Sequence, residues 1–463
     1  MPPRPLAALQ EAVATMLSAI ASLGAVLAID AEPGPAILAV VLSLSLSRSH
    51  LDHGLRERFE AAIAMPLVAL GATGIGVLLH RMPWVGAAVF TVALFVSIWL
   101  RRFGPLAGRA GSLIALPLVT LLVAPYVPAT KVPAPFAHLM PIVVALIALA
   151  SVTIVQTLAR RLRLLPPVKT KHEPTVASRG DSSLRPDATT RMAIQMAVAI
   201  ALSFVVGFVF FAERWSWIVL TAFIVLSGNR GRLDVAYKSV LRVAGAAGGT
   251  VVALLVSLRH DASDPATAAL ILAAVFLGLW LRPLGYAWWA LFVTIALALL
   301  QDFSGTAQPM LGLRLEEIVI GALIGVASAW IVLPVRSTAV LRRRLADALA
   351  ALSDALDPAN ATRTSDAFVA ALVRVEQVSL AFRAARRISR ANTTPADWTD
   401  ALSACRAPAV ALIEARETPA ASRKAAGAAR RALRDMQGLP DALVDLRETL
   451  KADVARCLPA ASG

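Results

Sequence analysis

The chain is poor in cysteine, histidine, tyrosine and charge. Of its 463 residues, two are Cys, six are His and three are Tyr, and only 16% are Asp, Glu, Lys or Arg. Neither the scattered histidines nor Cys405 and Cys457 have the spacing of metal ligands, so we expect ordinary thiols and no metal site. A charged fraction this small argues against a soluble protein, which must cover itself with polar side chains.

Enzyme signatures are also lacking. The sequence holds no nucleophile elbow, no Walker motif and no pair of catalytic carboxylates. The glycines of "GATGIG" at residues 71–76 follow no strand and precede no Lys-Ser or Lys-Thr, so they indicate close helix packing rather than a phosphate loop. We expect neither enzyme activity nor a cofactor.

Long apolar runs fill most of the chain. Hydrophobic residues make up 57% of it, and the mean hydropathy is +0.69. Before Leu333 they form twelve runs near the length of about 20 residues that spans a bilayer. The runs at 35–47 and 215–226 are short and could be re-entrant, but charge placement favours full spans. The sequence therefore predicts an all-α membrane protein of about twelve spans.

The distribution of basic residues predicts which loops face the cytoplasm. The formal net charge is +15. If every run crosses the membrane and the N-terminus is cytoplasmic, most Lys and Arg before Leu333 fall in inside loops. The outside loops then hold only Arg81, Lys131, Arg214, Arg259 and Arg314. We expect a bacterial inner-membrane protein with both termini cytoplasmic, an uncleaved first span, and no nucleic-acid binding.

The apolar part contains an internal repeat. "WLRRFG" at 99–104 recurs as "WLRPLG" at 280–285, and "PIVVALIALASVTIV" from Pro141 resembles "EIVIGALIGVASAWIV" from Glu317. These matches predict two tandem six-helix units, at 1–159 and 191–334. An even number of spans gives both units the same orientation, so a pseudo-two-fold axis along the membrane normal would relate them and a solute path could lie between them.

Two polar segments accompany these units. Residues 160–190 are basic and interrupted by proline, as in a flexible cytoplasmic linker. Residues 335–463 are rich in alanine with apolar residues at helical spacing, which predicts four or five amphipathic helices in a cytoplasmic bundle. Within it, Thr394-Pro395-Ala396-Asp397 has the N-cap, first-turn proline and third-position acid of a helix start.

Three stretches and the tail carry a resemblance to a known family. They are "WSWIVLTAFIV" from Trp215, "RVAGAAGGT" from Arg242 and "RLEEIVIGALIG" from Arg314, followed by Pro334. The second half resembles the fusaric-acid-resistance-like (FUSC) family of the aromatic acid exporter superfamily and, more distantly, plant aluminium-activated malate transporters. The resemblance implies export of aromatic or other weak organic acids, in some members beside a periplasmic adaptor subunit. One departure is Pro66-Leu67, where the second half has Gly248-Gly249.

An exported carboxylate needs positive charge along its path. Candidates begin the third helix of each unit: Arg56 and Arg58 in the first, Lys238 and Arg242 in the second. These groups could ring a cytoplasmic mouth, or could simply be topology determinants in contact with lipid phosphate. Arg242 stands out because Gly245 and Gly249 follow it at a spacing that allows close helix approach, and Gly321 is expected to serve helix packing in the last span.

Other candidates each have a structural alternative. Arg314 and Glu317 share a helix face, so Glu317 could titrate protons for coupled export or could belong to an interfacial ion pair. Glu213 carries the same ambiguity. Trp217 could stack on an aromatic acid or sit in the interfacial aromatic belt. The arginines of the repeated hexamers could contact substrate or only mark a membrane boundary.

Together these features predict a transporter that exports small aromatic organic acids, coupled to protons because no ATP-binding element is present. A passive organic-anion channel is one alternative. Another is a membrane-anchored interaction protein that acts through its cytoplasmic helices. The expected partners are small organic anions and the lipid bilayer, while an adaptor subunit and a homo-oligomer stay open.

Overall fold

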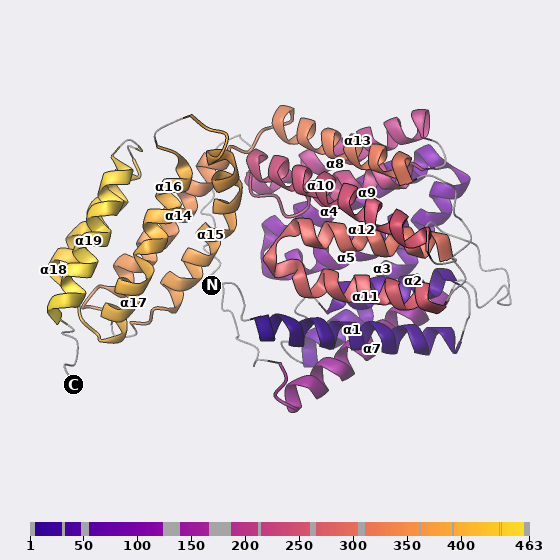
Figure 1. Cartoon of the computed structure of the whole chain (residues 1–463), viewed down its shortest axis with the longest axis horizontal. Coiled ribbons are helices and arrows are strands. Elements are labelled where there is room, and N and C mark those ends of the chain that lie inside the picture. The colour runs from indigo at the N-terminus through magenta and orange to yellow at the C-terminus, as the bar shows by residue number, and fades with distance from the viewer. Residues whose placement is uncertain are drawn as a thin grey trace. The chain divides into compact units, whose positions relative to one another are not determined.

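The computed structural model describes residues 5–29, 33–47, 55–123, 139–165, 187–211, 214–259, 265–303, 311–360, 363–390, 393–434, 436 and 438–457. Every regular element in these ranges is helical, as Figure 1 shows, so the all-α prediction is confirmed for this part of the chain. The chain divides into two compact units. Unit 1 comprises Met1–Gly228 and Lys238–Leu333, and unit 2 comprises Asn229–Tyr237 and Pro334–Gly463.

Unit 1 contains two successive sets of six described helices. The first set is α1 (Pro5–Leu27), α2 (Pro33–Leu46), α3 (Leu55–Arg81), α4 (Pro83–Trp99), α5 (Pro105–Val123) and α7 (Met140–Arg161), with the short 3-10 helix η1 (Leu100–Phe103) before α5. The second set is α8 (Ala188–Phe210), α9 (Trp215–Leu226), α10 (Arg232–Ser257), α11 (Pro265–Leu281), α12 (Tyr286–Phe303) and α13 (Leu311–Ile331), with η2 (Arg282–Leu284) before α12.

The two sets share an order of helix lengths and a pattern of packing. The second helix is the shortest in each, with 14 residues in α2 and 12 in α9. In the first set α1, α2 and α7 contact one another, and in the second set α8, α9 and α13 do the same. The sets meet where α4 packs on α8, α5 on α9 and α1 on α11.

Helix starts and stops follow local sequence signals. Prolines open five of these helices: α1, α2, α4, α5 and α11. This position suits proline because its missing N–H would have no partner there. At α8 the Asp187 carboxylate accepts a hydrogen bond from the Thr190 N–H at 2.9 Å. After η1, Gly104 has a φ of 112°, a left-handed conformation that glycine adopts without strain, and α5 begins at the next residue.

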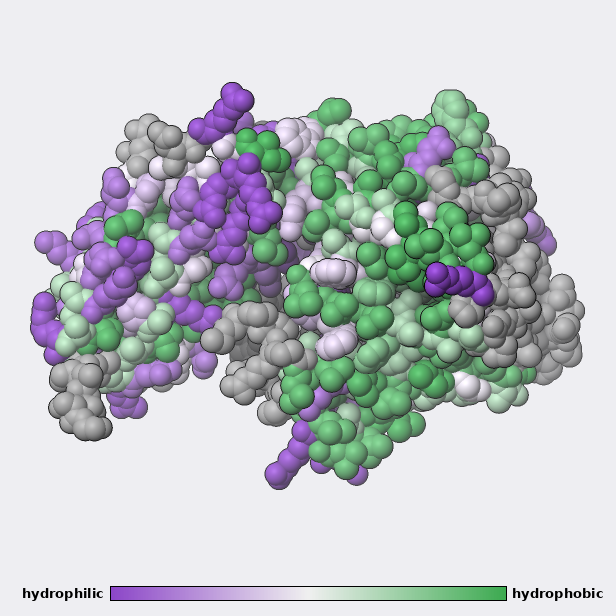
Figure 2. Space-filling view, in the orientation of Figure 1, coloured by the Kyte–Doolittle hydropathy of each residue, from purple (hydrophilic) through white to green (hydrophobic). Residues whose placement is uncertain are grey.

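Six described helices are long and apolar enough to cross a membrane: Leu6–Leu27, Pro83–Phe103, Met140–Arg161, Ala188–Phe210, Arg232–Ser257 and Ala266–Leu284. Shorter apolar helices cover Gly34–Leu46, Pro66–Arg81, Trp215–Leu226 and Tyr286–Leu300. Large side chains point outward, with Phe210 73%, Leu258 75% and Ile331 78% exposed. Figure 2 shows hydrophobic residues crowding the visible face of unit 1. Such a surface requires lipid rather than water around it, which makes this a membrane protein.

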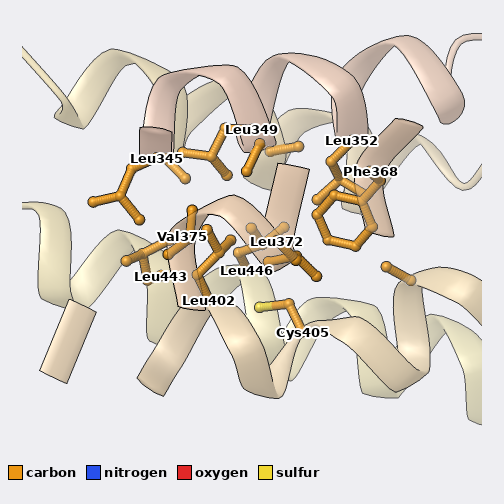
Figure 3. Packing of buried hydrophobic residues seen from close by; sticks show 14 of the residues in the cluster. Leu345, Leu349, Leu352, Phe368, Leu372, Val375, Leu402, Cys405, Leu443 and Leu446 are labelled. Atoms are coloured by element: carbon orange, nitrogen blue, oxygen red, sulfur yellow. The ribbon is translucent and has the colours of Figure 1, made fainter. Parts of the chain in front are cut away.

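Unit 2 is a bundle of six described helices: α14 (Ser337–Ala355), α15 (Asp366–Arg386), α16 (Pro395–Ala404), α17 (Arg406–Glu414), α18 (Ala420–Ala432) and α19 (Leu439–Cys457). Apolar residues at helical spacing, such as Leu345, Leu349 and Leu352 of α14, form its core. Figure 3 shows Leu352 beside Phe368 at one end of this cluster and Leu345 near Val375 at the other, with Leu372 between them. Each of the three α14 leucines is 0% exposed.

The count of helices in unit 2 corrects the sequence-based expectation of four or five. The break between α16 and α17 falls at Cys405, three residues before Pro408. Proline has no N–H to donate to the carbonyl four residues back, which is that of Ala404, so the helix ends there and starts again. The expected start of α16 is confirmed, because the Thr394 N–H donates to the Asp397 carboxylate at 2.7 Å.

A short segment ahead of Lys238 belongs to unit 2. The Arg232 N–H donates to the Val335 carbonyl at 3.1 Å, and the Leu233 N–H donates to the Ser337 hydroxyl at 2.9 Å. Helix α10 therefore begins in unit 2 and continues into unit 1. Most of the expected linker at 160–190 lies outside the described residues.

Candidate functional site

The most deeply buried basic side chain in the described part of unit 1 is Arg242, in the third turn of α10. Its side chain is large and only 2% exposed. Tyr286, the first residue of α12, lies within electrostatic reach of both Arg242 and Arg282. Among the described residues, the Nε of Arg242 has no hydrogen-bond partner. A guanidinium withdrawn from water in an apolar helix layer favours an anionic partner.

Two glycines bring α10 against α12 beside this arginine. A Cβ atom at Gly245 would lie 2.6 Å from the Ala287 carbonyl oxygen, and one at Gly249 would lie 2.5 Å from that of Leu291. Only a hydrogen atom fits at these positions. The glycine contact therefore sets the distance between the two helices that carry Arg242 and Tyr286.

A second group of charges lies where α13 packs on α9. The Nε of Arg214, one residue before α9, lies 3.4 Å from the Oε1 of Glu317, whose side chain is 1% exposed. The guanidinium of Arg314 lies over the Trp217 ring, 4.6 Å from its centroid. One turn beyond Glu317, a Cβ at Gly321 would lie 2.5 Å from the Ile218 carbonyl oxygen, so this glycine lets the two helices approach closely.

This second group combines a desolvated carboxylate with two guanidinium groups. The carboxylate can accept a proton, and each guanidinium can bind a carboxylate in a bidentate manner. The Trp217 side chain is 8% exposed and Arg314 lies over its ring, so the ring contacts this arginine in the structure. The stacking role considered for Trp217 would require a ligand on its other face or displacement of Arg314.

Lys238 has a structural contact. Its Nζ donates to the Gly228 carbonyl at 3.2 Å and to the Ser227 carbonyl at 3.5 Å. These carbonyls lie at the C-terminal end of α9, where backbone acceptors are otherwise unsatisfied and a positive charge is favourable. Lys238 therefore stabilises the end of α9 in this conformation.

The other predicted site residues are only partly described. Arg56 and Arg58 lie in the first turn of α3, and their side chains fall outside the described structure. Glu213 also lies outside the described residues. The structure therefore does not test whether these charges from the two sets of helices form a ring. It places Arg56 and Arg58 on α3, and Lys238 and Arg242 on α10.

The repeated hexamers place arginine against aromatic rings. The Arg102 guanidinium lies 5.4 Å from the centroid of the Trp99 ring and 5.2 Å from that of Phe103. In the second copy, Arg282 lies 5.8 Å from the Trp289 ring. Each contact is a cation–π interaction at the turn between two helices. These arginines thus have structural partners within unit 1.

Sequence reasoning missed two features. One is the pairing of Arg214 with Glu317, because spacing along a helix points only to the neighbour Arg314. The other is an aromatic cluster between the two sets of helices, in which the Phe204 ring lies 5.4 Å from Phe90 and 5.3 Å from Trp215. Phe208 adjoins both Trp84 and Trp215, at 5.2 Å and 5.5 Å. Aromatic residues recur in these runs, but contacts across helices are not visible in them.

No group of three or more His, Cys, Asp or Glu residues that could hold a metal ion occurs within the described part of the chain. The candidate site is therefore built from arginine, a carboxylate and aromatic rings on α9, α10, α12 and α13.

Comparison with known proteins points to the same helices. Residues 197–328 match the family model described as fusaric acid resistance protein-like. The match runs from α8 into α13 and includes both charged groups. No curated protein sequence and no solved structure matches the chain. The second set of helices of this membrane protein is therefore similar to the fusaric acid resistance protein-like family over residues 197–328, as the sequence resemblance predicts.

Proposed function

We propose that the protein is a bacterial inner-membrane transporter that exports small aromatic organic acids and couples this export to protons. The single observation that carries the proposal is Arg242, a guanidinium 2% exposed in an apolar helix layer of the matched domain. Withdrawing an ion from water costs several kcal/mol unless it is paired. An intramembrane charge is therefore commonly kept for a solute or ion path.

The proposed architecture is two tandem six-helix transmembrane units in the same orientation, about twelve spans, followed by a cytoplasmic helical bundle. Three observations support it. The two sets of helices share an order of lengths, their first, second and last helices contact one another in the same way, and each has a 3-10 turn after its fourth helix. Both termini would then be cytoplasmic, and the solute path would lie between the two sets.

The group at α9 and α13 supplies a means of proton coupling. With Glu317 ionised, Arg214 is held at 3.4 Å from its carboxylate. Protonation of Glu317 removes that negative charge from beside Arg214 and Arg314, which favours the approach of a substrate carboxylate to these guanidinium groups. A proton and an organic anion would in this way influence each other's binding at one place.

Transport into proteoliposomes that contain the full-length protein tests the proposal. Labelled 4-hydroxybenzoate should accumulate when a pH gradient is imposed. Replacing Arg242 by Ala should slow uptake about tenfold or more, because a charge-assisted hydrogen bond contributes about that factor. Arg259→Ala, at an exposed position just after α10, is the matched control and should transport normally.

Three outcomes would contradict parts of this proposal. Uptake that is unchanged when an ionophore collapses the pH gradient would exclude proton coupling and favour a passive anion channel. Normal transport by the Arg242→Ala protein would remove this residue from the path. Loss of the cellular phenotype on deleting residues 335–463, with transport intact, would favour the docking role instead.

A further inference from the structure

Four arginines line one shallow hollow in unit 2. The hollow has a volume of about 400 Å³ and lies between α14 and the C-terminal part of α18. Its lining residues are Ala339, Arg342, Arg343, Ala346, Arg430, Leu433 and Arg434. Two arginines thus come from each side, and the remaining lining residues are small or apolar. No acidic side chain belongs to the lining.

Five arginines elsewhere in the described part of the same unit have acidic partners. Arg383 lies 2.6 Å from the Asp400 carboxylate, and Arg386 lies 2.7 Å from that of Asp397. Other such pairs are Arg344 with Asp347, Arg447 with Glu448, and Arg456 with Asp453. The four arginines of the hollow form no such pair with an acid in the described part of the unit. The hollow therefore differs from these paired sites, because four arginines converge on it without an acid among its lining residues.

The arrangement is electrostatically unfavourable when empty. Like charges that converge on one hollow repel one another, and α18 contains no acidic residue that could offset them. Arg430 lies in the last turn of α18, where a helix favours a cation, but this does not apply to Arg342 and Arg343 in the second turn of α14. Four exposed guanidinium groups around an apolar floor create a local positive potential that attracts anions.

The kind of anion follows from the groups that meet it. Guanidinium forks match phosphate oxygens in a bidentate manner, and a ligand with two or more negative charges could contact both α14 and α18. The volume suits a small ligand, since ligand pockets begin at about 300 Å³. We propose that the hollow formed by Arg342, Arg343, Arg430 and Arg434 binds a phosphate-bearing anion, either a soluble phosphate compound or the headgroup of an anionic lipid.

Two probes separate these sources. Full-length protein in a neutral maltoside detergent is titrated with inorganic pyrophosphate by isothermal titration calorimetry. The same protein is placed in nanodiscs of phosphatidylcholine alone or of phosphatidylcholine with phosphatidylglycerol, and its thermal unfolding is followed. Binding of pyrophosphate identifies a soluble ligand, whereas stabilisation by phosphatidylglycerol without pyrophosphate binding identifies a lipid headgroup.

A pair of double variants tests the location. Arg343→Ala/Arg430→Ala removes one guanidinium from each side of the hollow, and Arg423→Ala/Lys424→Ala removes the same charge from exposed positions of α18 outside it. The first should weaken binding about a hundredfold, since each charge-assisted contact contributes about tenfold. The second should bind within about twofold of the unchanged protein, because distant surface charges are screened by salt.

A loss of binding in the Arg343→Ala/Arg430→Ala protein can be separated from a loss of folding. Since removing like charges relieves repulsion, the Arg343→Ala/Arg430→Ala protein should unfold at the same temperature as the unchanged protein, or higher, when no ligand is present. The proposal is overturned if neither probe binds, or if the two double variants lose binding equally.

Discussion

Arg214 and Glu317 form an ion pair between two helices that are far apart in the sequence. The Nε of Arg214 lies 3.4 Å from the Oε1 of Glu317, and the exposed fractions of the two side chains are 29% and 1%. One residue precedes α9 and the other lies in the second turn of α13. The ion pair therefore fixes the start of α9 against α13, one turn from the close contact of these helices at Gly321.

Replacing Glu317 by Gln should destabilise unit 1. The change keeps the volume of the side chain but removes the buried carboxylate charge that faces Arg214, at a cost of about 3 kcal/mol. Thermal unfolding in detergent should show a lower midpoint. Glu316→Gln, at an exposed neighbouring position, is the control and should change little. A double replacement, Arg214→Gln/Glu317→Gln, should recover part of the loss; no recovery would mean that the pair itself contributes nothing.

Glycine-to-alanine replacements should have opposite effects at two kinds of site. At Gly245 and Gly249 the added methyl would collide with backbone of α12, and such overpacking costs about 1–3 kcal/mol. At Gly71 and Gly74 in α3 the methyl meets nothing within 4 Å, so the close helix packing predicted from the sequence is wrong for these two glycines. The higher helix propensity of Ala should therefore stabilise by about 0.5–1 kcal/mol there. Thermal midpoints of the four proteins test this contrast. Equal destabilisation at all four sites would contradict the close approach of α10 to α12.

The two cysteines should differ in reactivity. Burial raises the pKa of the Cys405 thiol to about 12, against the opposing effect of Arg447 and Lys451. The thiol is thus neutral at physiological pH and closed to reagents, whereas Cys457 is partly exposed. Intact-mass analysis after maleimide treatment should find one label per chain, and none in the Cys457→Ser protein. Labelling of both thiols under native conditions would indicate that the core of unit 2 opens readily.

The start of α16 should be sensitive to acid. Burial alone would raise the pKa of Asp397, but hydrogen bonds from the Thr394 backbone and the Arg386 and Thr394 side chains outweigh it and lower that pKa. A lowered folded-state pKa means that the stabilisation is present above the ordinary value of about 4 and is lost as pH falls through the folded value.

Asp397→Asn should accordingly cost about 1 kcal/mol at neutral pH, as loss of a helix cap does, and the difference should shrink below about pH 4. Denaturant unfolding of the full-length protein, followed by circular dichroism at several pH values, measures it. Asp445→Asn, at an exposed position within α19, is the control. A difference that persists unchanged at low pH would contradict the cap.

Local signals in the sequence predicted the positions of several helices. The apolar run at 215–226 coincides with α9, and Thr394 and Asp397 form the expected helix start. The break at Cys405 was missed, although Pro408 is visible in the sequence, because a proline in the first turn of a helix is also common. Membership of Asn229–Tyr237 in unit 2 could not be predicted, since it rests on contacts with residues about a hundred positions later.

The candidate site was predictable only where one helix contains it. The spacing of Arg242, Gly245 and Gly249 predicted a packed helix interface. In the structure the two glycines contact α12, and Arg242 is buried. The partner of Glu317 was not predictable, because Arg214 reaches it from another helix. The contact of Lys238 with the end of α9 likewise depends on how the chain turns back at Gly228.

The outward-facing side chains of unit 1 have a practical consequence. When detergent is diluted, molecules would aggregate through the exposed apolar surface of unit 1, which includes Phe210, Leu258 and Ile331. The leucine core of unit 2 would stay folded. Turbidity would then report aggregation through unit 1 rather than unfolding of the whole protein. Stability of unit 2 is better followed by a probe inside its core, such as protection of Cys405.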